Sequence, residues 1–158
     1  MSTQYLTILR ESLEKKLNIL DEIIRISKIQ TELLSKESVD FEEYDRCVDD
    51  KDVCIEQIER LDYGFETLFQ KVKPELDENR AGYADWIAEA KRLIMEVTDK
   101  SVEIQALEAR NKQAIDEMIK KSRRGFQQGK RSMEVAKSYH RSMNPVNVAS
   151  SQYMDKRK

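Results

Sequence analysis

The sequence predicts an all-α protein, an antiparallel three-helix bundle or coiled coil of long helices with a flexible basic C-terminal tail. The 158 residues include only 4 Gly and 2 Pro, so the turn-forming clusters that strands require are nearly absent. Charged residues make up 37% and hydrophobic residues 39%, a balance typical of helices that each bury one stripe. The apolar residues also recur every three or four positions, which is the helical period.

The first helix is expected over about residues 3–35. One apolar face is formed by Leu6, Leu9, Leu13, Leu17, Leu20 and Ile24. A second stripe widens this arc in the second half of the helix: Ile19, Ile23, Ile26 and Leu33. Such an arc indicates either contact with two neighbouring helices at once or a surface kept for a partner.

The second helix is expected over about residues 40–72. Asp40 is the predicted N-cap, with Glu43 three residues later as in a capping box. The short connection makes the first two helices an antiparallel hairpin. Pro74 is expected to end the helix, because a proline disfavours the helical conformation of the residue before it. Residues 73–84 would then form the second connection.

The third helix is expected over about residues 85–121. Its apolar stripe is Trp86, Ala90, Leu93, Val97, Ile104, Leu107, Ala114 and Met118. Ser101 and Asn111 interrupt the stripe, and we place both at the solvent edge of the bundle. The other interpretation is a polar residue inside the seam, where it would fix the register of the helices. Residues 1–121 are thus expected to form one helical-bundle domain.

The composition changes after the third helix. Residues 120–158 contain eleven Lys and Arg but two acidic residues, a net charge of +9 in a chain of net −2, so the first 119 residues carry −11. Gly125 and Gly129 weaken helix formation there, and Asn144-Pro145 stops it. Residues 122–158 are therefore expected to be a separate binding tail, basic and marginally helical to disordered.

Residues that carry enzyme chemistry are scarce. His140 is the single histidine, and no Gly-rich phosphate loop is present. The cluster at residues 49–52 lacks the central Gly and closing Glu of a calcium loop, so we interpret it as a solvated helix face. We expect no enzyme activity, no metal, no cofactor and no small-molecule substrate.

The two cysteines are predicted to be reduced thiols near the bundle seam. Cys47 and Cys54 lie seven residues apart on one predicted helix, so their Cα atoms would be roughly 10 Å apart. A disulfide requires a separation below about 7 Å. No apolar run approaches the ~20 residues that span a bilayer, and no signal peptide is visible, so a soluble cytoplasmic protein is expected.

The helical hairpin, its middle segment and the amphipathic C-terminus together resemble the FlgN-type flagellar export chaperones. The segment has the form D-x3-YDRCVDDKDVCIEQIERLDYGFETL, at residues 40–68. Most of the likeness lies between Leu6 and Leu68, and it is closest between Lys51 and Leu61. The resemblance implies a cytosolic chaperone of type III secretion, which holds terminal segments of hook–filament junction proteins and delivers them to the export gate.

The resemblance also implies where partners bind. The family is similar in using its C-terminal helix and tail for cargo, which corresponds here to Phe126, Met133, Ala136, Tyr139 and Met143. It also uses a C-terminal tyrosine to dock on the export gate protein. Tyr139 is the first candidate for this docking and Tyr153 the second.

Other functions stay open at this stage. The basic tail could bind nucleic acid through phosphate contacts, although the acidic first 119 residues would oppose that binding. The chain could instead be a structural coiled-coil adaptor without cargo, although the interrupted third stripe disfavours a long zipper. An amphipathic tail lying on an anionic membrane is a third alternative, with Phe126 and Tyr139 as its aromatic anchors.

Overall fold

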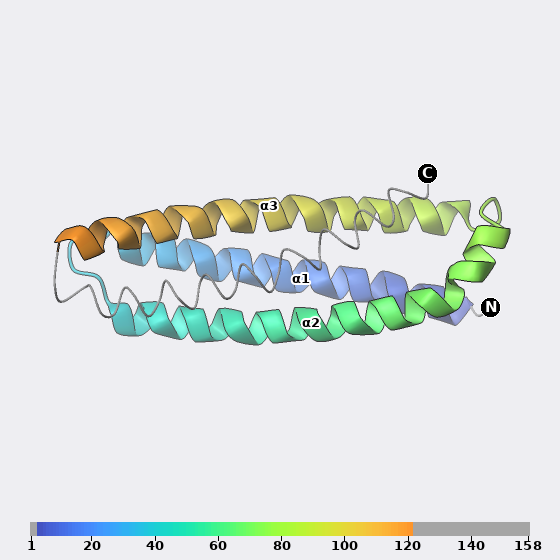
Figure 1. The fold of residues 1–158 in the computed structure, drawn as a ribbon, viewed down its shortest axis with the longest axis horizontal. Helices are drawn as coiled ribbons and strands as arrows, with labels where there is room; N and C mark the ends of the chain where they lie inside the picture. Colours follow the sequence, from blue (N-terminus) through green and yellow to red (C-terminus); the bar gives the residue numbers. More distant parts are fainter. Residues whose placement is uncertain (1–2, 122–158) are drawn as a thin grey trace.

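The computed structural model describes residues 3–121, and these form three helices and no strand. The helices are α1 (Thr3–Leu34), α2 (Phe41–Glu78) and α3 (Ala84–Lys121). They lie lengthwise beside one another, each antiparallel to the one before it in the chain (Figure 1). The all-α prediction is confirmed, whereas the predicted tail at residues 122–158 lies outside the described residues.

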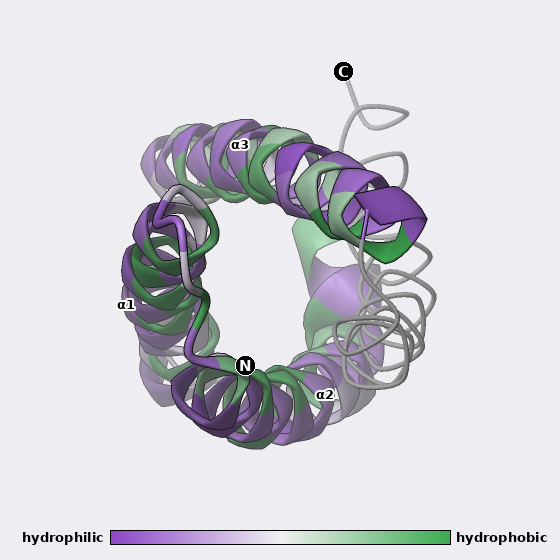
Figure 2. Ribbon diagram, turned by 90° about the vertical axis from the view of Figure 1, so that its left-hand side faces the viewer, coloured by the Kyte–Doolittle hydropathy of each residue, from purple (hydrophilic) through white to green (hydrophobic). Residues whose placement is uncertain are grey.

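Helix α1 is the centre of the bundle. Both α2 and α3 pack along it, but within residues 3–121 no Cα atom of α2 comes within 8 Å of one of α3. The view along the bundle shows α1 between the other two helices (Figure 2). In the second half of α1, Ile23, Ile24 and Ile26 are all buried. The wide apolar arc therefore serves two neighbouring helices, which was one of the two interpretations of the sequence.

The core is one continuous apolar cluster along the bundle. Leu9, Leu20 and Ile23 of α1 are completely buried. The other two helices contribute stripes at helical spacing, among them Ile55, Ile58, Phe69 and Val72 of α2 and Leu93, Val97, Ile104 and Ile115 of α3. Most residues of the stripes predicted for α1 and α3 thus point inward, and the burial of the core is the main source of stability.

The predicted start of α2 is confirmed. Asp40 has an extended backbone, with φ −83° and ψ 91°, and its side chain accepts a hydrogen bond from the backbone N–H of Glu43 at 3.1 Å. This bond satisfies one of the N–H groups that the first turn of a helix leaves without a partner.

The predicted end of α2 at residue 72 is wrong. The helix continues through Pro74 to Glu78, and its last turns bend out of line at the end of the bundle (Figure 1). Pro74 removes one helical hydrogen bond, but Leu76 beyond it is buried in the core. The backbone N–H of Asn79 then closes the helix on the carbonyl of Glu75 at 3.1 Å. The second connection is accordingly shorter than residues 73–84, since α3 begins at Ala84.

The placement of Ser101 and Asn111 at the solvent edge is also wrong, because both side chains are buried. The Ser101 hydroxyl donates to the carbonyl of Val97 at 2.8 Å. Asn111 donates from Nδ2 to the carbonyl of Ser27 at 3.2 Å and accepts from the Thr31 hydroxyl at 2.8 Å. Polar groups can be buried here because each finds a partner within its own helix or across the α1–α3 seam.

Candidate functional site

None of the residues predicted to bind cargo or the export gate can be placed. Phe126, Met133, Ala136, Tyr139, Met143 and Tyr153 all lie outside the described residues. Their roles stay predictions. Within residues 3–121 the structure offers a different feature, a groove on the surface of the bundle.

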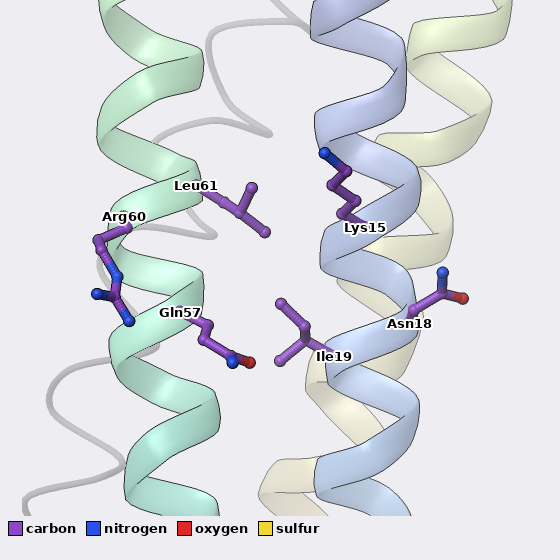
Figure 3. Close-up of a pocket in the computed structure, with 6 residues that line it drawn as sticks. All are labelled: Lys15, Asn18, Ile19, Gln57, Arg60 and Leu61. Carbon is purple, nitrogen blue, oxygen red and sulfur yellow. The ribbon is translucent and has the colours of Figure 1, made fainter.

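The groove runs between α1 and α2. Its larger part is a hollow of about 590 Å³, lined by Lys15, Asn18 and Ile19 of α1 and by Gln57, Arg60 and Leu61 of α2. Ile19 and Leu61 point toward each other across the space between the two helices (Figure 3). A second hollow of about 330 Å³ shares Lys15, Arg60 and Leu61 with the first.

The two hollows are adjacent because of these shared residues, and we refer to them together as the α1–α2 groove. It is lined by α1 between residues 8 and 19 and by α2 between residues 57 and 68. Since the two helices are antiparallel, Ile8 and Leu68 belong to the same hollow, and Ile19 and Gln57 to the other.

Gly64 lines the smaller hollow and leaves space in it, because glycine has no side chain. A Cβ atom built on this glycine would meet no heavy atom within 4 Å, so the space beside α2 is open there. Ser12 is the small lining residue on α1 in the same hollow. A glycine inside a helix costs about 1 kcal/mol relative to alanine. Helix α2 therefore carries a local weakness at the position where a larger side chain would fill the groove.

The lining is mostly apolar. Ile8 is 45% exposed, the largest exposed fraction among the apolar residues of the lining. The apolar lining residues are Ile8, Leu9, Ile19, Leu61, Phe65 and Leu68. A groove with an apolar floor between two helices is the kind of surface that accepts the apolar face of a third helix.

The charged lining residues are mainly cationic. Lys15 and Arg60 both border the two hollows, and Glu11 is the only acidic residue of the lining. Neither cation takes part in an ion pair with any residue of the described range. Lys15 and Arg60 therefore present positive charge on the surface of a region, residues 1–119, whose net charge is −11.

A buried ion pair is formed by Lys16 and Asp62, which directly follow the lining residues Lys15 and Leu61 in the chain. Lys16 Nζ donates to Asp62 Oδ1 at 2.7 Å, and their side chains are only 4% and 12% exposed. The other carboxylate oxygen of Asp62 has no hydrogen-bond partner. Burial raises the pKa of Asp62, and the nearby Lys16 ammonium only partly offsets that rise. The pair ties α1 to α2 beside the residues that line the groove.

A second buried polar cluster joins all three helices. Lys51 of α2 forms an ion pair with Glu108 of α3, and the Ser27 hydroxyl of α1 donates to the same carboxylate at 3.1 Å. The prediction of a solvated face at residues 49–52 holds for the three exposed aspartates but is wrong for Lys51, which is 4% exposed. Lys51 turns inward because it follows the period of Val48 and Ile55 on the core face of α2.

Neither the Lys16–Asp62 pair nor the Lys51–Glu108 cluster was predicted from the sequence, although the spacing of the charged residues could have indicated both. Lys16, Lys51 and Glu108 each occupy a position where the helical period of the apolar stripe expects a core residue. In helices this rich in charge, such positions are easily assigned to solvent. A charged residue at such a position indicates a buried ion pair, because a charge is seldom buried without a partner.

No metal site or membrane span is found in the part of the chain that the structure describes. Residues 3–121 contain no group of three or more His, Cys, Asp or Glu placed to hold a metal ion. Cys47 and Cys54 are free and buried, as predicted, and burial raises the pKa of both thiols. None of the three helices is long and apolar enough to cross a membrane.

Comparison with known proteins gives one match. A family model described as FlgN protein matches residues 1–144. That range contains all three helices, the α1–α2 groove and five of the six predicted partner-binding residues; Tyr153 lies beyond it. No curated protein and no solved structure matches the chain.

Proposed function

Because the chain belongs to the FlgN family of flagellar chaperones, we propose that it binds terminal segments of hook–filament junction proteins and delivers them to the type III export gate. The action is non-catalytic binding in the cytoplasm. The family match over residues 1–144 is the observation that carries this proposal.

The fold supports binding of this kind. Three long helices bury a thin core and leave most of their surface in water, including the apolar α1–α2 groove. A terminal segment of an exported protein is unfolded before export and can dock as an amphipathic helix. The ordering of that segment opposes binding and keeps the complex releasable at the gate.

The extent of the family match bears on the choice between the two tyrosines. Tyr139 lies inside the matched residues and Tyr153 outside them. We therefore favour Tyr139 for docking on the export gate protein. Phe126, Met133, Ala136, Tyr139 and Met143, all of them inside the match, keep their proposed role in binding cargo.

The test is affinity purification of the full chain from its own cells, followed by mass spectrometry. Hook–filament junction proteins should be among the enriched partners. The Tyr139→Ala variant should lose the export gate protein, while the matched Tyr153→Ala variant keeps both this protein and the cargo. Enrichment of nucleic acid alone, or of no flagellar protein, would contradict the proposed function.

A further inference from the structure

The size of the α1–α2 groove limits what can occupy it. Each wall is twelve residues long, at 8–19 of α1 and 57–68 of α2. At a rise of 1.5 Å per residue, this is about 16 Å, or three helical turns. The two hollows of about 590 and 330 Å³ form a strip rather than a closed cavity, so the shape fits a short helix better than a small molecule.

The charges on the groove indicate which helix fits. Lys15 and Arg60 border both hollows, without an ion-pair partner in residues 3–121, and only Glu11 opposes them on the lining. The basic residues 120–158 of this chain, with a net charge of +9, would place like charges against this pair. A helix with acidic residues beside its apolar face would place opposite charges there, which favours encounter and fixes orientation.

We propose that the α1–α2 groove is a docking site for an acidic amphipathic helix of the exported client protein. Apolar side chains at positions i, i+4, i+7 and i+11 of that helix pack between Ile8, Ile19 and Leu61. Its flanking carboxylates pair with Lys15 and Arg60. The proposal rests on the proposed function only for the identity of the client, because the groove and its charges are features of the bundle itself.

Gly64 provides a way to block the groove without harming the bundle. Because a Cβ there meets no atom within 4 Å, Gly64→Leu places a side chain in open space of the groove. Leucine is also a better helix former than glycine, so α2 should become more stable. The matched control is Gln113→Leu, which adds the same side chain at an exposed position of α3.

A second pair of variants tests the charges. Lys15→Glu combined with Arg60→Glu reverses the two groove cations. Arg110→Glu combined with Lys112→Glu makes the same change in net charge at two exposed positions of α3, away from the groove. Any effect of overall charge should appear equally in both double variants.

Binding is measured on the full chain by fluorescence anisotropy with two labelled synthetic peptides of about 18 residues, enough for three turns and both ends. Both peptides carry leucine at positions i, i+4, i+7 and i+11. The remaining positions are mostly glutamate in the acidic peptide and mostly lysine in the basic peptide. The wild type should bind the acidic peptide about tenfold more tightly than the basic one, and the groove double variant should reverse this order. Gly64→Leu should lower the affinity for the acidic peptide by about tenfold. The two α3 control variants, Gln113→Leu and Arg110→Glu with Lys112→Glu, should bind it like the wild type.

Equal affinity for the two peptides, or an unchanged affinity in the groove variants, would overturn the proposal. So would tighter binding of a peptide of residues 122–143, which would make the chain's own tail the occupant. Conversion of a dimer to a monomer by Gly64→Leu in sedimentation would equally overturn it, in favour of a second copy of the chain.

Purification from cells separates this proposal from the proposed function. If junction proteins accompany the wild type and the Lys15→Glu, Arg60→Glu variant in equal amounts, the function stands and the groove contributes nothing to their binding. If no junction protein accompanies the wild type, the function fails, and the peptide measurements still decide what the groove binds.

Discussion

At the residue scale, the Lys51–Glu108 ion pair joins α2 and α3, two helices that pack mainly against α1. The Cα atoms of α2 and α3 stay more than 8 Å apart along the described residues, yet these two side chains meet in the interior beside Ser27 of α1. Both side chains are 5% exposed or less, so each charge depends on the other for compensation. The cluster fixes the relative register of the three helices, because sliding α2 or α3 would separate the two charges and sliding α1 would withdraw the Ser27 hydroxyl from them.

Removing one member of this pair should be far more harmful than removing both. Lys51→Met leaves Glu108 buried without its cation, and we expect a loss of about 3–5 kcal/mol in the free energy of unfolding. The double variant Lys51→Met, Glu108→Leu should recover most of that loss, because it leaves no unpaired charge. Urea unfolding followed by far-UV circular dichroism measures both. A single variant as stable as the wild type would show that the pair is solvated.

The contribution of Asp62 to the free energy of unfolding should depend on pH, with the opposite sign to that of most paired carboxylates. Burial raises its folded-state pKa above the ordinary value of 3.8, so the folded chain binds this proton more tightly than the unfolded chain does. Its contribution is therefore full below pH 3.8 and falls as the pH rises through the raised folded-state pKa. Relative to Asp62→Asn, the wild type should gain stability as the pH is lowered through this window. Unfolding free energies of the two proteins across that range measure the difference, and a difference that grows with pH would contradict the assignment.

At the element scale, the last turns of α2 are part of the folded core. Leu76 lies beyond Pro74 and is 4% exposed. We expect Leu76→Ala to lower the free energy of unfolding by about 2–5 kcal/mol, as for other buried leucines. Glu78→Ala, at an exposed position two residues later, should change it by less than about 0.5 kcal/mol. Equal small effects of the two substitutions would mean that the chain after Pro74 is a loose connection.

The number and order of the helices could be predicted from the sequence. The end of α2 and the polar residues buried between the helices could not. Apolar stripes and the Asp40 cap are local signals, and both were sufficient to place the helices. The continuation of α2 past Pro74 depends on the burial of Leu76, which is a tertiary contact that outweighs a local preference. The burial of Asn111 likewise depends on partners on α1, about 80 residues away in the chain.

The groove could not be predicted for a related reason. Its walls come from two helices, and their relative register is set by distant contacts such as the Lys16–Asp62 pair. One local signal was available, a glycine in the middle of a long helix at residue 64. Such a glycine usually has a packing or functional reason, because it weakens the helix.

At the scale of the whole molecule, α1 is central, so both helix–helix interfaces of the bundle, α1–α2 and α1–α3, require it. The α1–α3 seam carries the ion pair of Lys100 with Asp21 and the hydrogen bond from the Trp86 indole N–H to the carbonyl of Leu6, at 2.9 Å. The α1–α2 seam carries the Lys16–Asp62 pair. Loss of α1 packing should therefore release both outer helices together, even though they make few contacts with each other.

This arrangement predicts a single cooperative unfolding transition. Trp86 is the only tryptophan, so its fluorescence reports the α1–α3 seam, and alkylation of the buried thiols Cys47 and Cys54 reports α2. The two probes should give the same urea midpoint. Leu20→Ala, at a completely buried position of α1, should lower the free energy of unfolding by about 2–5 kcal/mol and move both midpoints equally. If the midpoints separated instead, α2 or α3 would leave α1 independently, and the buried Lys51–Glu108 pair would not couple them.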